Sequence, residues 1–170
     1  MCPLRMLTSQ DTASLPGLGA LLIDSVEGGA SVGFLRPLNP DAATHYWQQV
    51  LAAIPSELCV WVAEVDGQLV GSVQLSLCPK ENGRHRAEVQ KLLVLSAYRG
   101  RGLARALMQV AEAHAWALGR TLLVLDTQKG SIAETVYQRL GWQKAGEIPD
   151  FAASPDGALH PTALYFKRRG

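Results

Sequence analysis

The chain has 170 residues, of which 48% are hydrophobic and 18% charged, a profile that fits one globular domain and excludes a disordered chain. This length buries about 70% of the unfolded chain's surface, so no disulfide or metal is needed for stability. Sixteen lysines and arginines against 15 aspartates and glutamates leave a formal charge of +1, which gives no reason to expect nucleic acid as a partner. We therefore expect residues 1–170 to form a single domain.

The cysteines and the start of the chain predict a cytoplasmic protein. The three cysteines, Cys2, Cys59 and Cys78, are odd in number and lack paired spacing, which argues against a disulfide framework. Cys59 and Cys78 are expected to be small buried side chains. Pro3 and Arg5 interrupt the start of the chain, which lacks the apolar run of a secretory signal. No apolar stretch approaches the roughly 18 residues of a membrane span, so no membrane partner is expected.

In the first half of the chain, apolar spacing predicts a short strand, two helices and a β-hairpin. These elements fall at residues 5–8, 15–27, 40–54, 58–65 and 68–77. Asn39 followed by Pro40 is a helix-start signal. Asp66 and Gly67 form a two-residue hairpin turn, so the strands on either side should be antiparallel neighbours.

In the second half, the pattern predicts four strands and two helices. They fall at residues 87–95, 102–118, 121–126, 131–140, 142–147 and 162–166. A strand, a long helix and another apolar strand make a βαβ unit, so strands 87–95 and 121–126 should be parallel. The sequence therefore predicts an α/β fold with a mixed sheet and the element order β-α-α-β-β-β-α-β-α-β-β.

The segment from Tyr98 to Arg105 joins the central strand to the clearest helix and carries two glycines. Glycines allow a close backbone approach to a ligand, and the first turn of a helix offers unpaired N–H groups and a positive dipole end. Such a turn is a phosphate site. The surrounding cations are Arg84, Arg86, Lys91, Arg99, Arg101 and Arg105, against one acid, Glu88. The alternative is a glycine turn with solvated arginines.

Two known phosphate loops fit this segment poorly. The nucleotide-triphosphate loop requires Gly-Lys-Ser/Thr, which is absent. In the dinucleotide fingerprint, Gly100 and Gly102 would be the first two glycines and Asp126 the ribose-binding acid. However, Arg105 occupies the third position, which must be small for helix and strand to pack.

The pattern Arg99-x-x-Gly102-x-Ala104 after an apolar strand resembles the pyrophosphate motif of the GNAT superfamily of acetyl-coenzyme A dependent N-acetyltransferases. The element order is also similar to that family. A second match is the family's stretch on the last helix, here Ala133, Tyr137, Gly141 and Trp142. The resemblance implies the GNAT acyltransferase fold and acetyl-coenzyme A as co-substrate. It places the pyrophosphate on Arg99, Gly100, Arg101, Gly102, Leu103 and Ala104.

Over essentially the full chain, the sequence is similar to the tabtoxin-resistance acetyltransferases. The segments that carry this likeness are residues 28–34, 86–92, 155–157, 160–162 and 165–167. The likeness implies a small-molecule amine acceptor, such as a toxin amino acid that contains a β-lactam. A homodimer is one option for assembly. Similar sequences need not share an acceptor.

The sequence departs from the family pattern at two positions. Gly130 stands where the family often has an asparagine that contacts the pantetheine arm, and Ser131 is our substitute for that contact. Ser96 stands where many members have proline. Neither change touches the pyrophosphate loop.

Acetyl transfer to an amine needs donors for the carbonyl oxygen and a route for protons. The resemblance assigns the carbonyl oxygen and the pantetheine amides to backbone groups of Leu92, Leu93 and Val94, at a point where the central strand separates from its neighbour. A fully paired strand is the alternative. Glu88 and Asp126 should flank one cleft and hold or deprotonate the amine. Alternatively, Glu88 forms an ion pair with Arg86 or Lys91, and Asp126 caps the following turn.

Three aromatic or histidine side chains complete the candidate site. Tyr137 is predicted to donate a proton to the leaving thiolate, with a core tyrosine bonded to backbone as the alternative. Phe34, in the loop between the first two helices, is either a wall of the acceptor pocket or a core anchor of the loop. His160 has a substrate role or is a turn residue.

No metal site is predicted, because the four histidines lack the spacing of metal ligands. His114 is expected to face out of its helix.

The leading hypothesis is a small-molecule N-acetyltransferase. A protein N-acetyltransferase and a non-catalytic sensor that binds acyl-coenzyme A are the alternatives.

Overall fold

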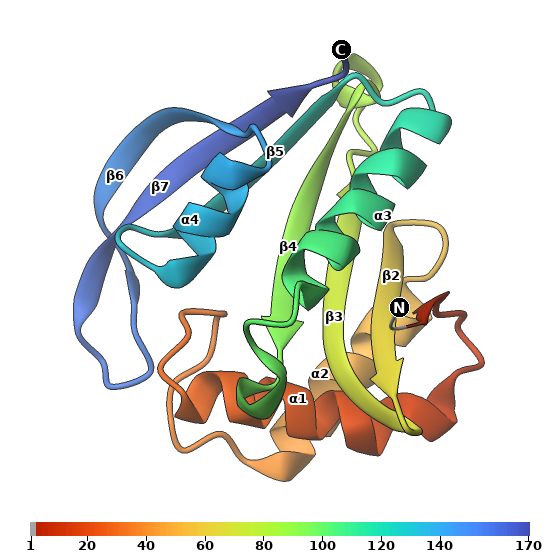
Figure 1. Cartoon of the computed structure of the whole chain (residues 1–170), viewed down its shortest axis with the longest axis vertical. Helices are drawn as coiled ribbons and strands as arrows, with labels where there is room; N and C mark the ends of the chain where they lie inside the picture. Colours follow the sequence, from red (N-terminus) through yellow and green to blue (C-terminus); the bar gives the residue numbers. More distant parts are fainter. Residues whose placement is uncertain (1–2) are drawn as a thin grey trace.

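The computed structural model describes residues 3–170, which form one mixed β-sheet with helices on both faces (Figure 1). Its seven strands lie in the order β1-β2-β3-β4-β5-β7-β6. β4 and β5 are parallel, and all other neighbours are antiparallel. The strands are β1 (Leu4–Met6), β2 (Leu58–Val65), β3 (Gln68–Leu77), β4 (Arg86–Val94), β5 (Leu122–Gln128), β6 (Gln143–Ala153) and β7 (Leu159–Arg168).

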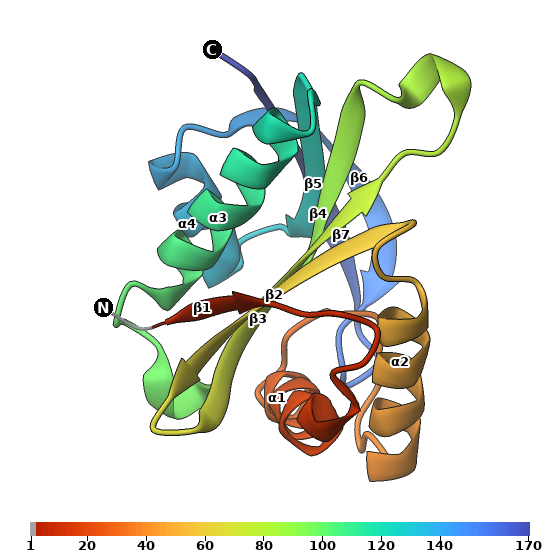
Figure 2. The same ribbon diagram turned by 90° about the vertical axis from the view of Figure 1, so that its right-hand side faces the viewer.

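Helices α1 and α2 cover one face of the sheet, and α3 and α4 cover the other (Figure 2). The helices are α1 (Leu15–Glu27), α2 (Pro40–Ala52), α3 (Leu103–Ala117) and α4 (Ile132–Arg139), with short 3₁₀ turns η1 (Thr12–Ser14), η2 (Glu81–Gly83) and η3 (Ser96–Tyr98). One apolar core, around Leu107 and Leu123, lies beneath α3 and α4. The other, around Trp47 and Val62, lies beneath α1 and α2. Within residues 3–170, no helix is long and apolar enough to cross a membrane.

The predicted α/β fold and its element order are confirmed. Local chemistry explains the boundaries that the sequence marked. Asn39 caps α2, because its side-chain oxygen accepts a hydrogen bond from the Asp41 N–H at 2.7 Å. Asp66 and Gly67 both have positive φ, 51° and 78°, as a type I′ hairpin turn requires.

The hairpin formed by β6 and β7 is longer than predicted. β6 reaches Ala153 and β7 begins at Leu159, whereas the sequence pattern predicted strands over 142–147 and 162–166. β6 lies at the edge of the sheet and nearly all of its residues are exposed. An edge strand with two solvated faces has no hydrophobic alternation, so the pattern could not mark its full length.

Two predicted placements are wrong. His114 does not face outward: its ring lies edge-on to Trp61 with centroids 5.0 Å apart, and its Nε2 is 3.7 Å from the Cys59 sulfur. Arg84 and Arg86 lie away from the glycine turn, because β4 starts at Arg86 and carries the chain about 26 Å to its last residue. Arg84 and Arg86 therefore lie at one end of the strand, Lys91 lies within it, and Arg99, Arg101 and Arg105 follow its other end.

The cysteine predictions hold in part. Cys59 is buried, and burial raises the pKa of its thiol. Cys78 is only half-buried, and both thiols are free. Cys2 lies outside the described residues.

Candidate active site

A large cleft follows the gap between β4 and β5 and has a volume of about 1130 Å³. Its walls come from the loop after α1, the glycine turn before α3, the end of β5, helix α4 and the β6–β7 hairpin. Pockets for a single small ligand usually measure about 300 to 1,000 Å³. The cleft is therefore large enough for two ligands that meet inside it.

The gap exists because β4 and β5 pair only near their first residues. The pairing covers residues 86–88 of β4 and 122–124 of β5 and then stops. Lys91 has a positive φ of 48° and shifts the register between β3 and β4, and such a bulge bends the strand that carries it. Within residues 3–170, the edge of β4 over residues 89–94 consequently has no strand partner on the β5 side. The predicted backbone role of Leu92, Leu93 and Val94 needs this free edge, and the alternative of a fully paired strand is excluded.

The glycine turn forms one end of the cleft. Gly100 and Gly102 have φ values of 76° and 80°, and a Cβ at either position would meet no atom within 4 Å, so open space lies in front of both. Gly102 is the N-cap of α3 and offers no side-chain oxygen, which leaves the first N–H groups of the helix for an anion. Two nearby guanidinium groups are held in place. Arg99 Nε donates to the Val94 carbonyl at 3.2 Å, and the Arg101 guanidinium lies 4.8 Å from the centre of the Tyr98 ring.

Asp24 fixes the chain just before this turn. Its carboxylate accepts hydrogen bonds from the Ser96 N–H at 2.8 Å and the Ser96 hydroxyl at 2.7 Å. Ser96 is the residue that replaces a common proline of the resembling family. In many family members the proline ring restricts the backbone at this position. Here the hydrogen bonds from Asp24 of α1 restrain η3 instead.

The middle of the cleft brings the two predicted carboxylates together. Glu88 and Asp126 both line it, from adjacent strands. Asp126 accepts a hydrogen bond from the Thr162 hydroxyl of β7 at 2.8 Å and lies within β5 rather than before a turn. None of the ion pairs formed by residues 3–170 involves Glu88. Within the described residues, Asp126 therefore does not cap a turn and Glu88 forms no ion pair.

Tyr137 lies on the inner face of α4, where it lines the cleft and is only 6% exposed. Its ring packs against Trp142 and Tyr165. Burial, and then the charge of Asp126, raises the pKa of its phenol. No hydrogen bond to its hydroxyl is found within residues 3–170, so the bond to backbone that the core alternative requires is not formed. The group is a neutral O–H donor over the whole physiological pH range.

Gly141 and Trp142, also part of the second matched stretch, hold the end of α4. Gly141 has a φ of 80° directly after the helix. The Trp142 indole N–H donates to Glu112 of α3 at 2.8 Å, and Lys167 of β7 binds the same carboxylate at 2.6 Å. These contacts fix α4 against α3 and the sheet, and thereby fix the ring of Tyr137.

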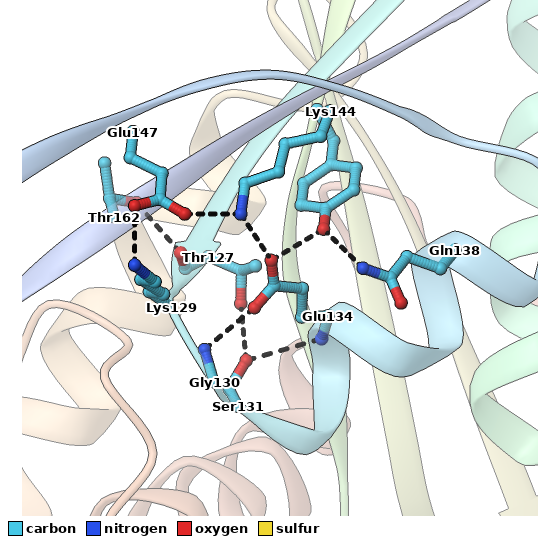
Figure 3. Close-up of polar contacts among 10 residues, drawn as sticks. Thr127, Lys129, Gly130, Ser131, Glu134, Gln138, Lys144, Glu147 and Thr162 are labelled. Atoms are coloured by element: carbon cyan, nitrogen blue, oxygen red, sulfur yellow. Dashed lines mark hydrogen bonds and ion pairs between the residues drawn. The ribbon is translucent and has the colours of Figure 1, made fainter.

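A polar cluster holds the start of α4 (Figure 3). Ser131 is the N-cap and accepts from the Glu134 N–H, while the Glu134 carboxylate accepts from the Gly130 N–H at 2.8 Å. The same buried carboxylate accepts from the Tyr165 hydroxyl at 2.6 Å and lies 3.3 Å from the Lys144 ammonium. These contacts, with the Tyr165 bond first in importance, hold the pKa of Glu134 below its usual range. Ser131 lines the cleft, but its hydroxyl already serves the helix start.

Phe34 and His160 occupy different positions relative to the cleft. Phe34 is partly buried and packs edge-on against Tyr46 of α2, with centroids 5.3 Å apart, and against the core beneath α1 and α2. The cleft wall on this side ends at Gly33. His160 lies in β7 rather than in a turn, and it lines the cleft.

Three features of the site escaped the sequence analysis. Lys91 lines the cleft and points toward Tyr46 of α2 rather than toward the glycine turn. Asp24 and Glu134 act through tertiary contacts that no local pattern marks. A helix-start signature, serine followed three residues later by glutamate, does occur at Ser131 and Glu134 and could have located the latter. Within residues 3–170, no three histidine, cysteine, aspartate or glutamate side chains are grouped to hold a metal ion.

Residues 31–142 match the family model described as "Acetyltransferase (GNAT) family". N-acetyltransferase 8 of Rattus norvegicus is 40% identical over 91 residues, which are 51% of this chain and 40% of that relative. The chain thus accounts for less than half of that relative's length.

Among solved structures, ribosomal-protein-alanine N-acetyltransferase from Brucella melitensis superposes with a TM-score of 0.82 at 23% identity, over 98% of this chain and 99% of the other. A putative acetyltransferase from Salmonella typhimurium, solved with its cofactor acetyl-CoA, gives a TM-score of 0.78 at 18% identity, over 99% and 94% of the two chains. At these identities the structural likeness establishes the fold.

Proposed function

Because the chain belongs to the GNAT acetyltransferase family, we propose that it transfers the acetyl group of acetyl-coenzyme A to the amine of a small molecule. One observation carries this proposal: a single cleft joins a cationic glycine turn at a helix start to two carboxylates, through a gap between parallel strands. An anionic coenzyme and a cationic acceptor can each meet the opposite charge and approach one another in the gap.

The residues of the glycine turn suit the pyrophosphate of the coenzyme. The free N–H groups at the start of α3, the open space before Gly100 and Gly102, and the charges of Arg99 and Arg105, which line the cleft, all favour a doubly charged anion. Arg101 does not line the cleft and rests on the Tyr98 ring. The free edge of β4 gives the pantetheine amides backbone partners, and its N–H groups stabilise charge on the carbonyl oxygen. Ser131 lies on the opposite wall, on the α4 side of the cleft.

Bound acetyl-coenzyme A supplies a thioester, a reactive acyl donor. The bound ammonium first loses one proton to become the free amine. In the transfer, a C–N bond then forms between the amine nitrogen and the acetyl carbon, the C–S bond breaks, the nitrogen loses a second proton and the thiolate gains one. Glu88 and Asp126 hold the incoming ammonium and, directly or through water, accept the amine's proton. The departing thiolate takes its proton from Tyr137, whose neutral phenol faces the cleft.

A contact at the rim favours a small acceptor over a polypeptide. The Arg36 N–H donates to the Pro155 carbonyl at 3.0 Å, and this bond joins the loop after α1 to the tip of the β6–β7 hairpin. Figure 1 shows these two segments side by side below the gap. Residues adjacent to both segments line the cleft, so the rim is continuous at this end. The narrower hypothesis of a toxin amino acid as acceptor, and with it a role in toxin resistance, rests on the sequence resemblance alone.

The test is a screen of small amines with acetyl-coenzyme A, read by thiol release, in the wild type and in Tyr137→Phe. The substitution keeps the ring and removes only the hydroxyl, so coenzyme affinity by calorimetry should stay within twofold while kcat falls about 10-fold to 1,000-fold. Equal rates in a folded Tyr137→Phe protein would show that water or another group protonates the thiolate. Thiol release with peptide amines alone would assign a protein acceptor, and coenzyme binding without any thiol release would identify a sensor.

A further inference from the structure

Lys91 places a positive charge in the part of the cleft where a cationic acceptor is expected. It lies on β4 between Glu88 and the glycine turn, at the bulge described above. Its ammonium is 5.7 Å from the centre of the Tyr46 ring, and a Cβ at Gly33 would be 3.7 Å from its nitrogen. The side chain therefore points toward α2 and the loop after α1, on the face of the sheet that α1 and α2 cover.

The Lys91 ammonium is half-buried and lacks a countercharge in contact with it. None of the ion pairs within residues 3–170 includes Lys91. Glu88 and Asp126 are near enough to oppose the effect of burial, but burial prevails and lowers the pKa of Lys91. Tyr46 cannot supply a negative charge, because burial raises the pKa of its phenol to about 12. A desolvated ammonium of this kind is stabilised by an incoming anion.

An acceptor that carried only an ammonium would be repelled by Lys91. An acceptor that also carries an anionic group would satisfy both kinds of charge, with its ammonium at Glu88 and Asp126 and its anion at Lys91. The three side chains arise from adjacent strands and line one cleft. The bulge at Lys91 gives this arrangement a structural origin, since it turns the residue out of the regular alternation of β4.

We propose that Lys91 binds a carboxylate of the acceptor, so that the acceptor is an amino acid or another amine that carries a carboxylate. This inference rests on the proposed acetyl transfer and narrows its substrate class. Lys91 is then a specificity-determining residue that contacts the acceptor and takes no part in the exchange of protons.

The experiment compares matched acceptors in matched variants. Each of several amino acids is assayed beside its primary amide, which keeps the side chain and the amine but removes the negative charge. The quantity measured is the ratio of kcat/KM for the acid to kcat/KM for the amide. Because the amide also changes the basicity of the amine, this ratio is compared between proteins, where that difference cancels.

The variants are Lys91→Met, Lys91→Arg and Lys80→Met. Methionine keeps the length and the unbranched stem of lysine, arginine keeps the charge, and Lys80 is an exposed lysine outside the cleft. In Lys91→Met, the acid-to-amide ratio should fall about 10-fold to 100-fold, mainly through KM for the acid. Lys91→Arg should retain at least part of the preference, and Lys80→Met should equal the wild type.

Two results would overturn the inference while leaving acetyl transfer intact. One is an acid-to-amide ratio of kcat/KM that is the same in Lys91→Met as in the wild type, with neither substrate affected. The other is an equal loss for acids and amides in Lys91→Met, which would assign the lysine to chemistry or to folding. Coenzyme affinity by calorimetry separates these cases from failure of the proposed function. A protein that bound no coenzyme, or acetylated no amine, would contradict that function and the inference with it.

Discussion

Glu134→Gln tests whether the buried carboxylate at the start of α4 holds the helix, and so Tyr137, in place. Glu134 is 8% exposed and accepts from the Tyr165 hydroxyl at 2.6 Å and the Gly130 N–H at 2.8 Å with different oxygens. Glutamine has the same shape but only one acceptor oxygen, so one of these two donors loses its partner. A buried donor left unpaired, or a lost bond to a charged group, costs about 1 to 3 kcal/mol. We expect the free energy of unfolding to fall by about 2 kcal/mol at pH 7.

The pH dependence distinguishes this explanation from a simple packing defect. The pKa of Glu134 is lowered in the folded protein, so its stabilising effect is fully present above the unfolded-state pKa of about 4.3. The effect is lost as the pH falls through the lower folded-state pKa. The stability difference between wild type and Glu134→Gln should therefore shrink below pH 4.

Denaturant unfolding at a series of pH values between 3 and 7 measures this difference directly. A double-mutant cycle with Tyr165→Phe should give a coupling energy of about 1 kcal/mol or more, because the two side chains share a hydrogen bond. A difference that is the same at every pH, together with additive effects in the cycle, would refute the assignment.

Four further substitutions test the glycine turn at one end of the cleft and the carboxylates in its middle. Gly102→Asp should weaken coenzyme binding at least 10-fold by calorimetry, since it places a carboxylate where the pyrophosphate approaches. The control Gly119→Asp, at the other end of α3 with a similar φ of 77°, should leave affinity unchanged, and equal affinity in both variants would exclude the glycine turn as the coenzyme site. Glu88→Gln and Asp126→Asn should impair turnover more than coenzyme affinity, the first mainly through kcat and the second mainly through the acceptor KM. Wild-type kinetics in both variants would show that neither carboxylate acts in the mechanism. Asp24→Ala removes the two hydrogen bonds that hold η3, so it should weaken coenzyme binding several-fold and lower the free energy of unfolding by about 1 kcal/mol. Unchanged affinity would show that the glycine turn keeps its conformation without Asp24.

The fold was predictable because its signals are local. Residues 58–65 and 68–77 were predicted to the residue, since alternation and the Asp66-Gly67 turn both lie within the segments concerned. The start of α2 follows from the adjacent Asn39 and Pro40. β6 was underestimated because an exposed edge strand leaves no apolar pattern to read.

The geometry of the candidate site was predictable where it depends on the backbone. Glycines at positions 100 and 102 before a helix indicate an anion site from the chain itself, because positive φ and free N–H groups are properties of that short segment. That Glu88 and Asp126 line one cleft could also be anticipated, since a βαβ unit makes their strands parallel neighbours. The first inference needs only that segment, and the second needs only the order of the elements.

Tertiary structure alone decided which charges share a space. Arg86 and Lys91 are five residues apart in the sequence, yet one lies at the far end of β4 and the other in the cleft, because a bulge with positive φ redirects Lys91. The contacts of Asp24 with Ser96 and of Glu134 with Tyr165 join residues 72 and 31 positions apart. Such contacts depend on how the helices pack on the sheet. Burial and distance set the electrostatics of a side chain, and both are properties of the folded molecule rather than of the adjacent residues in the sequence.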